Sequence, residues 1–276
     1  MIQLGIFART WGDTIDVQPL FRQISSHGLS QVHFNMLCCG LTEQPTEIPE
    51  DTLKEVNAAS KAHGLGIAGL SSTFNMIHPD PKVIKNGIAS LGVLAASCHV
   101  LGCTFLSLCS GTRNAMDKWK WHPDNTTSES WRQLLQTLEI ALLIAEKYEV
   151  YLGVEPETAN VVCNARQAHR LLSEMQSDRL QIILDPANLF VVAKSKDEIT
   201  ALMLDAFELL QDNIAMVHAK DRKLSGEIKA PGKGDIDFEF FSKCLNQAQF
   251  EGAMIMHGLT ENEVSGSVQY LNEIIS

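Results

Sequence analysis

The sequence predicts a single-domain (β/α)8 barrel, an α/β fold that spans residues 1–276. Short β-prone runs alternate with segments of helical apolar spacing along the whole chain. Eight such pairs follow one another without a Gly/Ser-rich or Pro-rich linker. The length also fits, because barrels of this type routinely form one domain of about 250 residues. A doubly wound open sheet is the alternative, but the segment ARTWGD after the first strand lacks the glycine fingerprint usual in that fold.

The first half of the chain supplies four strand–helix pairs. The expected strands are Ile2–Ala8, Gln31–Met36, Leu65–Ser71 and Thr104–Ser110. The expected helices are Asp16–His27, Pro49–His63, Pro81–Leu101 and Thr127–Tyr148. A proline near the start and a glycine just past the end support the second and third helices. Leucines spaced three and four residues apart predict the buried face of the fourth helix.

The second half supplies four more pairs, and each of its strands ends in a residue that can bind a metal. The expected strands are Val150–Pro156, Leu180–Pro186, Ile214–Asp221 and Gly252–Gly258. The expected helices are Ala165–Met175, Lys196–Gln211, Phe238–Gln247 and Glu263–Ile275. The residues at the strand ends are Glu155, Asp185, His218 and His257.

These strand ends predict a metal site. In a barrel, the carboxyl ends of all strands surround one mouth, so the four side chains are expected to be neighbours. Taken singly, Asp185 could instead cap the next loop, and either histidine could be a core residue. Their joint occurrence favours a divalent cation as cofactor. Two carboxylates with two imidazoles suit Mn²⁺, Zn²⁺, Co²⁺ or Fe²⁺ better than Mg²⁺ or Ca²⁺.

Composition narrows the classes of partner. The formal charge of −11 argues against a nucleic-acid partner, whose phosphates would be repelled. The sequence contains no run of about 18 apolar residues, so no membrane span is expected. The N-terminal segment MIQLGIFARTW lacks a basic region and is interpreted as a first strand. Seven cysteines without a CxxC pair indicate reduced thiols and a cytoplasmic protein.

Five motifs resemble those of the xylose-isomerase-like TIM barrel superfamily. They are GVEPE at 153–157, LDPANLF at 184–190, HAKD at 218–221, GKGDIDF at 232–238 and the strand end at His257. That superfamily includes sugar and sugar-phosphate isomerases and epimerases, and apurinic-site endonucleases of the endonuclease IV type. The resemblance implies that Glu155, Asp185 and His218 are metal ligands.

Two positions depart from the superfamily's pattern. His257 stands where members usually have a glutamate, so the epimerase mechanism with two metal-bound glutamates cannot be transferred whole. Glu261, four residues further on, is a candidate for the missing carboxylate. Asn188 stands where the epimerases tend to have a histidine, but an amide can still hydrogen-bond a substrate hydroxyl.

Further candidates lie in loops at the same mouth. Lys220 could hold a substrate oxygen or pair with Asp221. The Gly232–Asp235 loop could bind a phosphate through its N–H groups or form a plain turn. Residues expected in the loops after the third and fourth strands are His78, Arg113, Trp119, Trp121 and His122. His78 and Arg113 are candidate substrate-binding residues, and the aromatic residues form either a lid or a contact with another subunit.

The function expected from these residues is metal-dependent isomerisation or epimerisation of a small sugar, sugar phosphate or polyol. Glu155 would be the catalytic base next to a carbonyl polarised by the metal. The expected partner is a small-molecule carbohydrate, and the chain is a candidate for homo-oligomerisation. The alternatives are an endonuclease IV-like repair enzyme, a lyase or dehydratase on the same scaffold, and a non-catalytic sugar-binding barrel.

Overall fold

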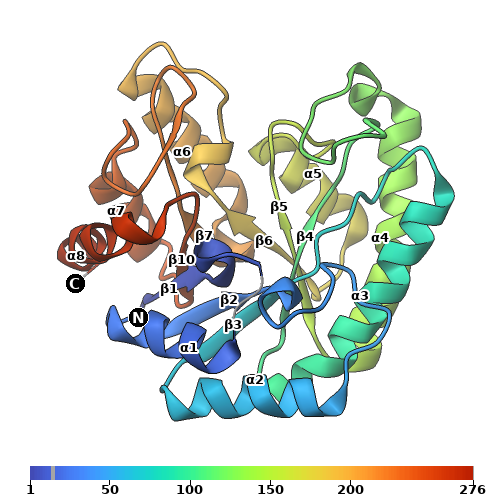
Figure 1. Ribbon diagram of the computed structural model, residues 1–276. Coiled ribbons are helices and arrows are strands. Elements are labelled where there is room, and N and C mark those ends of the chain that lie inside the picture. The colour runs from blue at the N-terminus through green and yellow to red at the C-terminus, as the bar shows by residue number, and fades with distance from the viewer. Residues whose placement is uncertain (14–15, 276) are drawn as a thin grey trace.

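The computed structural model describes residues 1–13 and 16–275 and confirms the predicted (β/α)8 barrel (Figure 1). Residues 14, 15 and 276 of the expected domain lie outside the described residues. The parallel strands close in the order β1-β10-β7-β6-β5-β4-β3-β2. These strands are β1 (Gln3–Phe7), β2 (Gln31–Phe34), β3 (Gly66–Ser71), β4 (Phe105–Cys109), β5 (Tyr151–Glu155), β6 (Leu180–Leu184), β7 (Ile214–Ala219) and β10 (Ala253–Met256).

A helix follows each barrel strand and covers the outside of the barrel. The helices are α1 (Val17–Ser26), α2 (Glu50–Ala62), α3 (Pro81–Leu101), α4 (Ser128–Tyr148), α5 (Ala165–Met175), α6 (Lys196–Leu210), α7 (Phe238–Gln247) and α8 (Val264–Ile275). Side chains that cap the helix N-terminus define where several of these helices begin. The Thr127 hydroxyl accepts a hydrogen bond from the Ser130 N–H, so Thr127 caps α4 and does not belong to it.

The expected strand Ile214–Asp221 is two residues too long. Strand β7 ends at Ala219, and Asp221 begins a separate antiparallel hairpin of β8 (Asp221–Arg222) and β9 (Ile228–Lys229). This hairpin was not predictable from the sequence, because two-residue strands are too short for a period-two pattern. The hairpin extends the loop after β7 over the barrel mouth.

Apolar side chains fill the barrel axis near the strand starts. Phe105, the first residue of β4, forms a buried cluster with Ile183, Met216, Ala253 and Ile255. Glycines make room for its ring, since a Cβ on Gly153 would lie 2.1 Å from Phe105 Cζ. The interior is therefore closed at this end, and polar side chains gather at the other.

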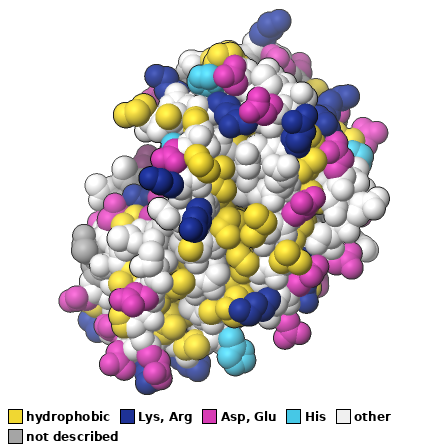
Figure 2. Space-filling view, turned by 90° about the vertical axis from the view of Figure 1, so that its right-hand side faces the viewer, with side chains coloured by type: hydrophobic (Ala, Val, Ile, Leu, Met, Phe, Trp, Pro, Cys, Tyr) yellow, Lys and Arg dark blue, Asp and Glu magenta, His cyan; other side chains and the backbone are white. Residues whose placement is uncertain are grey.

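Helices α3 and α4 form the face shown in Figure 2. Among the described residues, α3 alone is long and apolar enough by composition to cross a membrane. It packs against β3, β4, α2 and α4, as a barrel helix does. Apolar side chains form a band across this face, and Ile140 and Leu143 of α4 are 50% and 66% exposed. Homo-oligomerisation stays a prediction.

Two glycines of α3 provide a matched test of the packing behind the mouth. A Cβ on Gly87 would lie 2.1 Å from Cδ2 of the buried Phe74, whereas one on Gly92 would meet nothing within 4 Å. We expect Gly87→Ala to lower the free energy of unfolding by about 1–3 kcal/mol through overpacking. Gly92→Ala should raise it by up to about 1 kcal/mol through helix propensity. Urea unfolding followed by circular dichroism measures both, and equal stabilities would contradict the packing described.

Candidate metal centre

Three side chains from neighbouring strands converge at the carboxyl end of the barrel. Glu155 ends β5, Asp185 follows β6, and His218 lies in β7. His218 Nδ1 is 3.2 Å from Glu155 Oε1 and 3.7 Å from Asp185 Oδ2. One donor atom from each residue lies within 4.8 Å of the others. Adjacent parallel strands therefore bring together residues that are 30 or more positions apart.

Asn188 and Lys220 hold this group in place. The Asn188 amide donates to Glu155 Oε1 at 2.7 Å, and Lys220 Nζ donates to Asn188 Oδ1 at 2.9 Å. Lys220 Nζ also forms an ion pair with Asp185 Oδ2 at 2.7 Å, so its partner is Asp185 and not Asp221. Asp185 Oδ1 accepts a hydrogen bond from the Ala187 N–H at 2.9 Å. Asp185 therefore does cap the loop after β6 through Oδ1, while its Oδ2 faces Lys220 and His218.

Buried charges in this group stabilise one another. Burial would lower the pKa of His218, but the charge of Glu155 and contacts with Asp185 raise this pKa to about 9. Burial opposes the charged form of Asp185, yet Lys220 and His218 bring the pKa of Asp185 below its ordinary value. In the absence of a cation, His218 is thus an imidazolium that balances the two carboxylates.

His257 lies beside this group but outside it. Its ring stacks on His218 with centroids 5.3 Å apart and on Phe7 with centroids 4.8 Å apart. None of its nitrogens joins the donor group within 4.8 Å among the described residues. Burial and the charges of His218 and Lys220 lower the pKa of His257 well below its usual value, so its ring is neutral. Its expected role as a fourth ligand is not supported by this placement.

A cavity of about 420 Å³ opens above the centre. Its lining includes Glu155, Asn188, His218, Lys220 and His257 from the sequence-based candidates. It also includes residues that were not predicted: Arg9, His33, Glu43, Ser107, Glu157 and Arg222. A volume of this size is typical of small-molecule pockets.

Glu157 is the carboxylate that the sequence reasoning passed over. It lies two residues after Glu155 in the GVEPE motif, so an alternating pattern continued past the strand end would have indicated it. Burial and the charge of Glu155 raise the pKa of Glu157 to about 7. His33 of β2 is a second residue that the sequence reasoning passed over, and its Nε2 lies 3.0 Å from the hydroxyl of Ser107 in β4. Burial and the charge of His218 lower the pKa of His33 to about 3.

Asp221 organises the loop after β7. Its fully buried carboxylate accepts hydrogen bonds from the N–H groups of Arg222, Gly234 and Ile236 at 2.8, 2.8 and 3.2 Å. The Gly232–Asp235 loop therefore turns its Gly234 N–H toward Asp221, which favours the plain turn over a phosphate-binding loop. Asp237 caps α7 by accepting from the Phe240 N–H.

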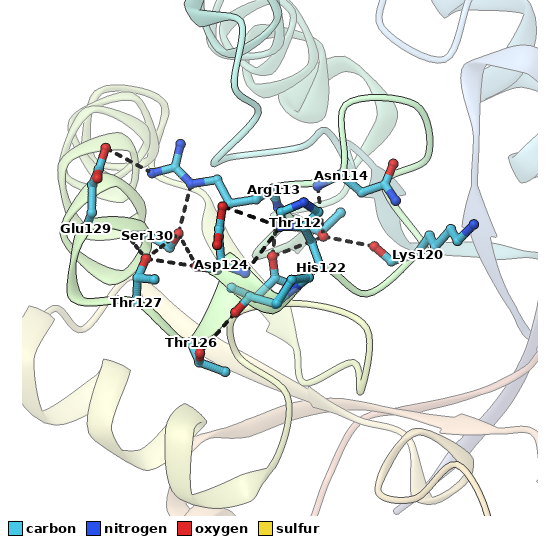
Figure 3. A network of polar contacts seen from close by, with 12 residues as sticks. Thr112, Arg113, Asn114, Lys120, His122, Asp124, Thr126, Thr127, Glu129 and Ser130 are labelled. Atoms are coloured by element: carbon cyan, nitrogen blue, oxygen red, sulfur yellow. Dashed lines mark hydrogen bonds and ion pairs between the residues drawn. The ribbon is translucent and has the colours of Figure 1, made fainter.

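Arg113 stabilises the loop between β4 and α4 and does not line the cavity (Figure 3). Its Nε donates to the Ser130 hydroxyl at 2.8 Å, and its backbone N–H donates to Asn125. In the same loop, Trp119 lines the cavity, while Lys118 pairs with Glu43 at 2.8 Å across the mouth. Of the aromatic residues in this loop, only Trp119 is among the described residues that line the cavity, and its role as a lid stays a prediction.

Two other candidates also lie away from the cavity lining. His78 Nε2 is 3.1 Å from the Ala115 carbonyl oxygen, and its Nδ1 accepts from the Asp80 N–H, so it connects two loops. Glu261 begins the short 3-10 helix Glu261–Glu263, where it contacts Gln23 at 3.4 Å in an exposed position. The structure therefore does not bring Glu261 to the place of the missing carboxylate.

A family model described as xylose isomerase-like TIM barrel matches residues 21–273. The chain belongs to this family. No curated protein sequence matches the chain.

Solved structures share the fold of this xylose isomerase-like barrel. D-psicose 3-epimerase from Clostridium cellulolyticum H10, crystallised with D-tagatose, is 14% identical with a TM-score of 0.75, and each chain is covered completely. The 3-keto-D-glucoside 4-epimerase YcjR from E. coli is also 14% identical with a TM-score of 0.75, over 99% of this chain and 100% of that one. The IOLI protein with a bound zinc atom is 15% identical with a TM-score of 0.74, over 100% and 98%.

The donor set of this family member fits a divalent cation. Two carboxylates and one imidazole are the ligand types of Zn²⁺, Mn²⁺, Co²⁺ and Fe²⁺ sites. His218 turns Nδ1 toward both carboxylates, as a shared cation would require. The side chains that would hold the cation are therefore Glu155, Asp185 and His218.

The stacking of His257 gives a direct test of the ligand set. We expect His257→Phe to keep one bound metal per chain, because the aromatic ring preserves the stack and the three donors remain. Asp185→Asn should weaken metal affinity by about tenfold or more, since it removes a charged ligand. Elemental analysis after dialysis and titration with Zn²⁺ measure both. Loss of the metal from His257→Phe with retained folding would show instead that His257 is a ligand.

Proposed function

We propose that this protein is a metal-dependent isomerase or epimerase that acts on a small sugar, sugar phosphate or related polyol. The observation that carries the proposal is the convergence of Glu155 and His218 on the floor of a cavity of about 420 Å³, with the buried Asp185 beside them. Polar side chains surround that floor, as recognition of a hydroxylated ligand requires. Two solved structures of the same fold are named as epimerases of sugars, which supports this reaction class.

A divalent cation bound to the three ligands would polarise a substrate carbonyl and make the neighbouring C–H bond more acidic. The ligand types favour Zn²⁺, Mn²⁺, Co²⁺ or Fe²⁺. The IOLI protein, which shares this fold, was solved with a bound zinc atom, which supports the use of a metal on this scaffold. The remaining chemistry falls to side chains of the cavity.

Glu155 is the side chain best placed to move the proton. Its Oε1 accepts from Asn188 and faces His218, so the carboxylate is fixed in orientation at the cavity wall. Its other oxygen, Oε2, has no hydrogen-bond partner among the described residues and can face a substrate C–H. A positioned carboxylate base of this kind contributes about 10²–10⁴-fold to rate.

Lys220 is placed to stabilise negative charge on a substrate oxygen. It lines the cavity, and the carboxylates of Asp185, Glu155 and Glu157 outweigh the effect of burial and raise its pKa. It therefore stays an ammonium group that donates hydrogen bonds. Its bond to Asn188 couples its position to that of Glu155.

The position of His257 bears on the choice between isomerisation and epimerisation. Transfer of a proton between adjacent carbons on one face needs one base, whereas inversion at a single carbon needs a second group on the opposite face. Glu261 lies outside the cavity, and His257 is a neutral ring stacked between Phe7 and His218. Isomerisation with Glu155 as the single base therefore needs the fewest catalytic groups, and it is the reaction that we favour.

Replacement of the base gives the decisive variant. We expect Glu155→Gln to fold with an unchanged circular dichroism spectrum and to lose about 10²-fold or more in kcat at saturating metal. Exchange of the substrate's C–H for deuterium in D₂O, followed by proton NMR, should be lost in parallel. Glu146→Gln, on the exposed surface of α4, is the matched control and should keep full activity. Deuterium exchange at the wild-type rate in Glu155→Gln would reject Glu155 as the base.

A further inference from the structure

Three lysine or arginine side chains line the cavity, and two of them have carboxylate partners. Arg9 forms hydrogen bonds of 2.6 and 3.0 Å with both oxygens of Asp13. Lys220 pairs with Asp185 at 2.7 Å. Within residues 1–13 and 16–275, no carboxylate lies within ion-pair distance of the third, Arg222. An arginine in a ligand cavity without a counter-ion is the feature that the proposed mechanism leaves unexplained.

Arg222 is held firmly enough to act as a binding group. Its backbone belongs to β8, and its N–H donates to the buried Asp221 carboxylate at 2.8 Å. Its guanidinium lies 5.8 Å from the centre of the Phe190 ring. Nη1 makes only long contacts of 3.4 Å with the carbonyl oxygens of Val191 and Gly226. These contacts orient the group but form no ion pair with it, because carbonyl groups are neutral. The charge of Arg222 acts on the pKa of Glu157 only from beyond ion-pair distance.

A shortage of acidic residues does not explain the missing partner. The chain has 33 acidic residues against 22 basic ones. Glu157 lines the same cavity, yet its carboxylate accepts a hydrogen bond from the Thr158 hydroxyl at 3.4 Å and forms no ion pair with Arg222. A guanidinium is always charged and matches the two oxygens of a carboxylate or phosphate. Its missing counter-ion is therefore expected on the ligand.

The hairpin places Arg222 apart from the metal ligands but in the same cavity. His218 and Lys220 reach the centre from the end of β7, and the chain then turns into β8, where Arg222 lies beside Phe190 and Val191. A ligand that contacts Glu155 through its carbonyl end can contact Arg222 through another part. We propose that the substrate carries an anionic group, a carboxylate or a phosphate ester, which Arg222 binds. This inference rests on the proposed function, since it names the substrate class of that site.

The test compares Arg222→Gln and Arg222→Lys with a neighbouring control in the metal-loaded protein. Lys223→Gln removes one charge from the same hairpin, but Lys223 is exposed and pairs with Glu227 at 3.4 Å. The probes are inorganic phosphate, measured by calorimetry, and a ketohexose, its 6-phosphate and the matching uronate, measured by turnover. Circular dichroism and thermal unfolding report whether each variant is folded.

We expect one of the two anionic sugars to exceed the neutral ketohexose in kcat/KM by about tenfold or more, as charge-assisted hydrogen bonds allow. Arg222→Gln should remove that advantage, Arg222→Lys should retain part of it, and Lys223→Gln should leave it intact. The preferred probe distinguishes a phosphate from a carboxylate.

Two results separate this inference from the proposed function. Glu155-dependent turnover of all three sugars at equal kcat/KM, unchanged by Arg222→Gln, would overturn the anion-binding role and leave the isomerase intact. Absence of turnover together with phosphate binding that weakens about tenfold in Arg222→Gln alone would support the anion-binding role and reject the isomerase. Phosphate binding unaffected by Arg222→Gln, without a preference for either anionic sugar, would also overturn it.

Discussion

The site depends on the burial of two carboxylates, Glu155 and Asp185, at adjacent strand ends. Removing like charges from water is costly unless positive charge and hydrogen bonds compensate. His218, Lys220 and the Asn188 amide supply that compensation, and each contacts one of the two carboxylates at 2.7–3.2 Å. A bound divalent cation would add to the same balance. The residues of the HAKD and LDPAN segments are thus best understood as one electrostatic unit.

The barrel separates structural and chemical roles along its axis. Phe105 and its apolar neighbours close the end near the strand starts, and Gly153 makes this possible by leaving space for the Phe105 ring. Two residues later the same strand presents Glu155 to the cavity. Side chains two positions apart in a strand point to the same face, so one strand contributes both to the apolar plug and to the site.

The fold and the core of the site followed from local patterns in the sequence. Eight alternating runs predicted the barrel, and the end of each run predicted which side chains would meet, because barrel closure fixes the neighbours. The orientation of His257 was not predictable in this way, since stacking on Phe7 and His218 depends on three strands at once. Arg113, His78 and Glu261 were assigned to the mouth by loop position alone, and local hydrogen bonds direct them elsewhere. Glu157 lies two residues past the end of β5, and Arg222 lies in the two-residue strand β8, so neither falls within a strand long enough to show a periodic pattern.

Two carboxylates close the base of the loop that carries the hairpin after β7. The Asp221 carboxylate binds the N–H groups of Gly234 and Ile236, and the Asp235 carboxylate binds the N–H of Leu224. The segment between these anchors carries no strand of the barrel. Changes of length or sequence there leave the strand register of the barrel undisturbed, and with it the positions of Glu155, Asp185 and His218. The loop can therefore alter the cavity rim independently of the candidate metal ligands.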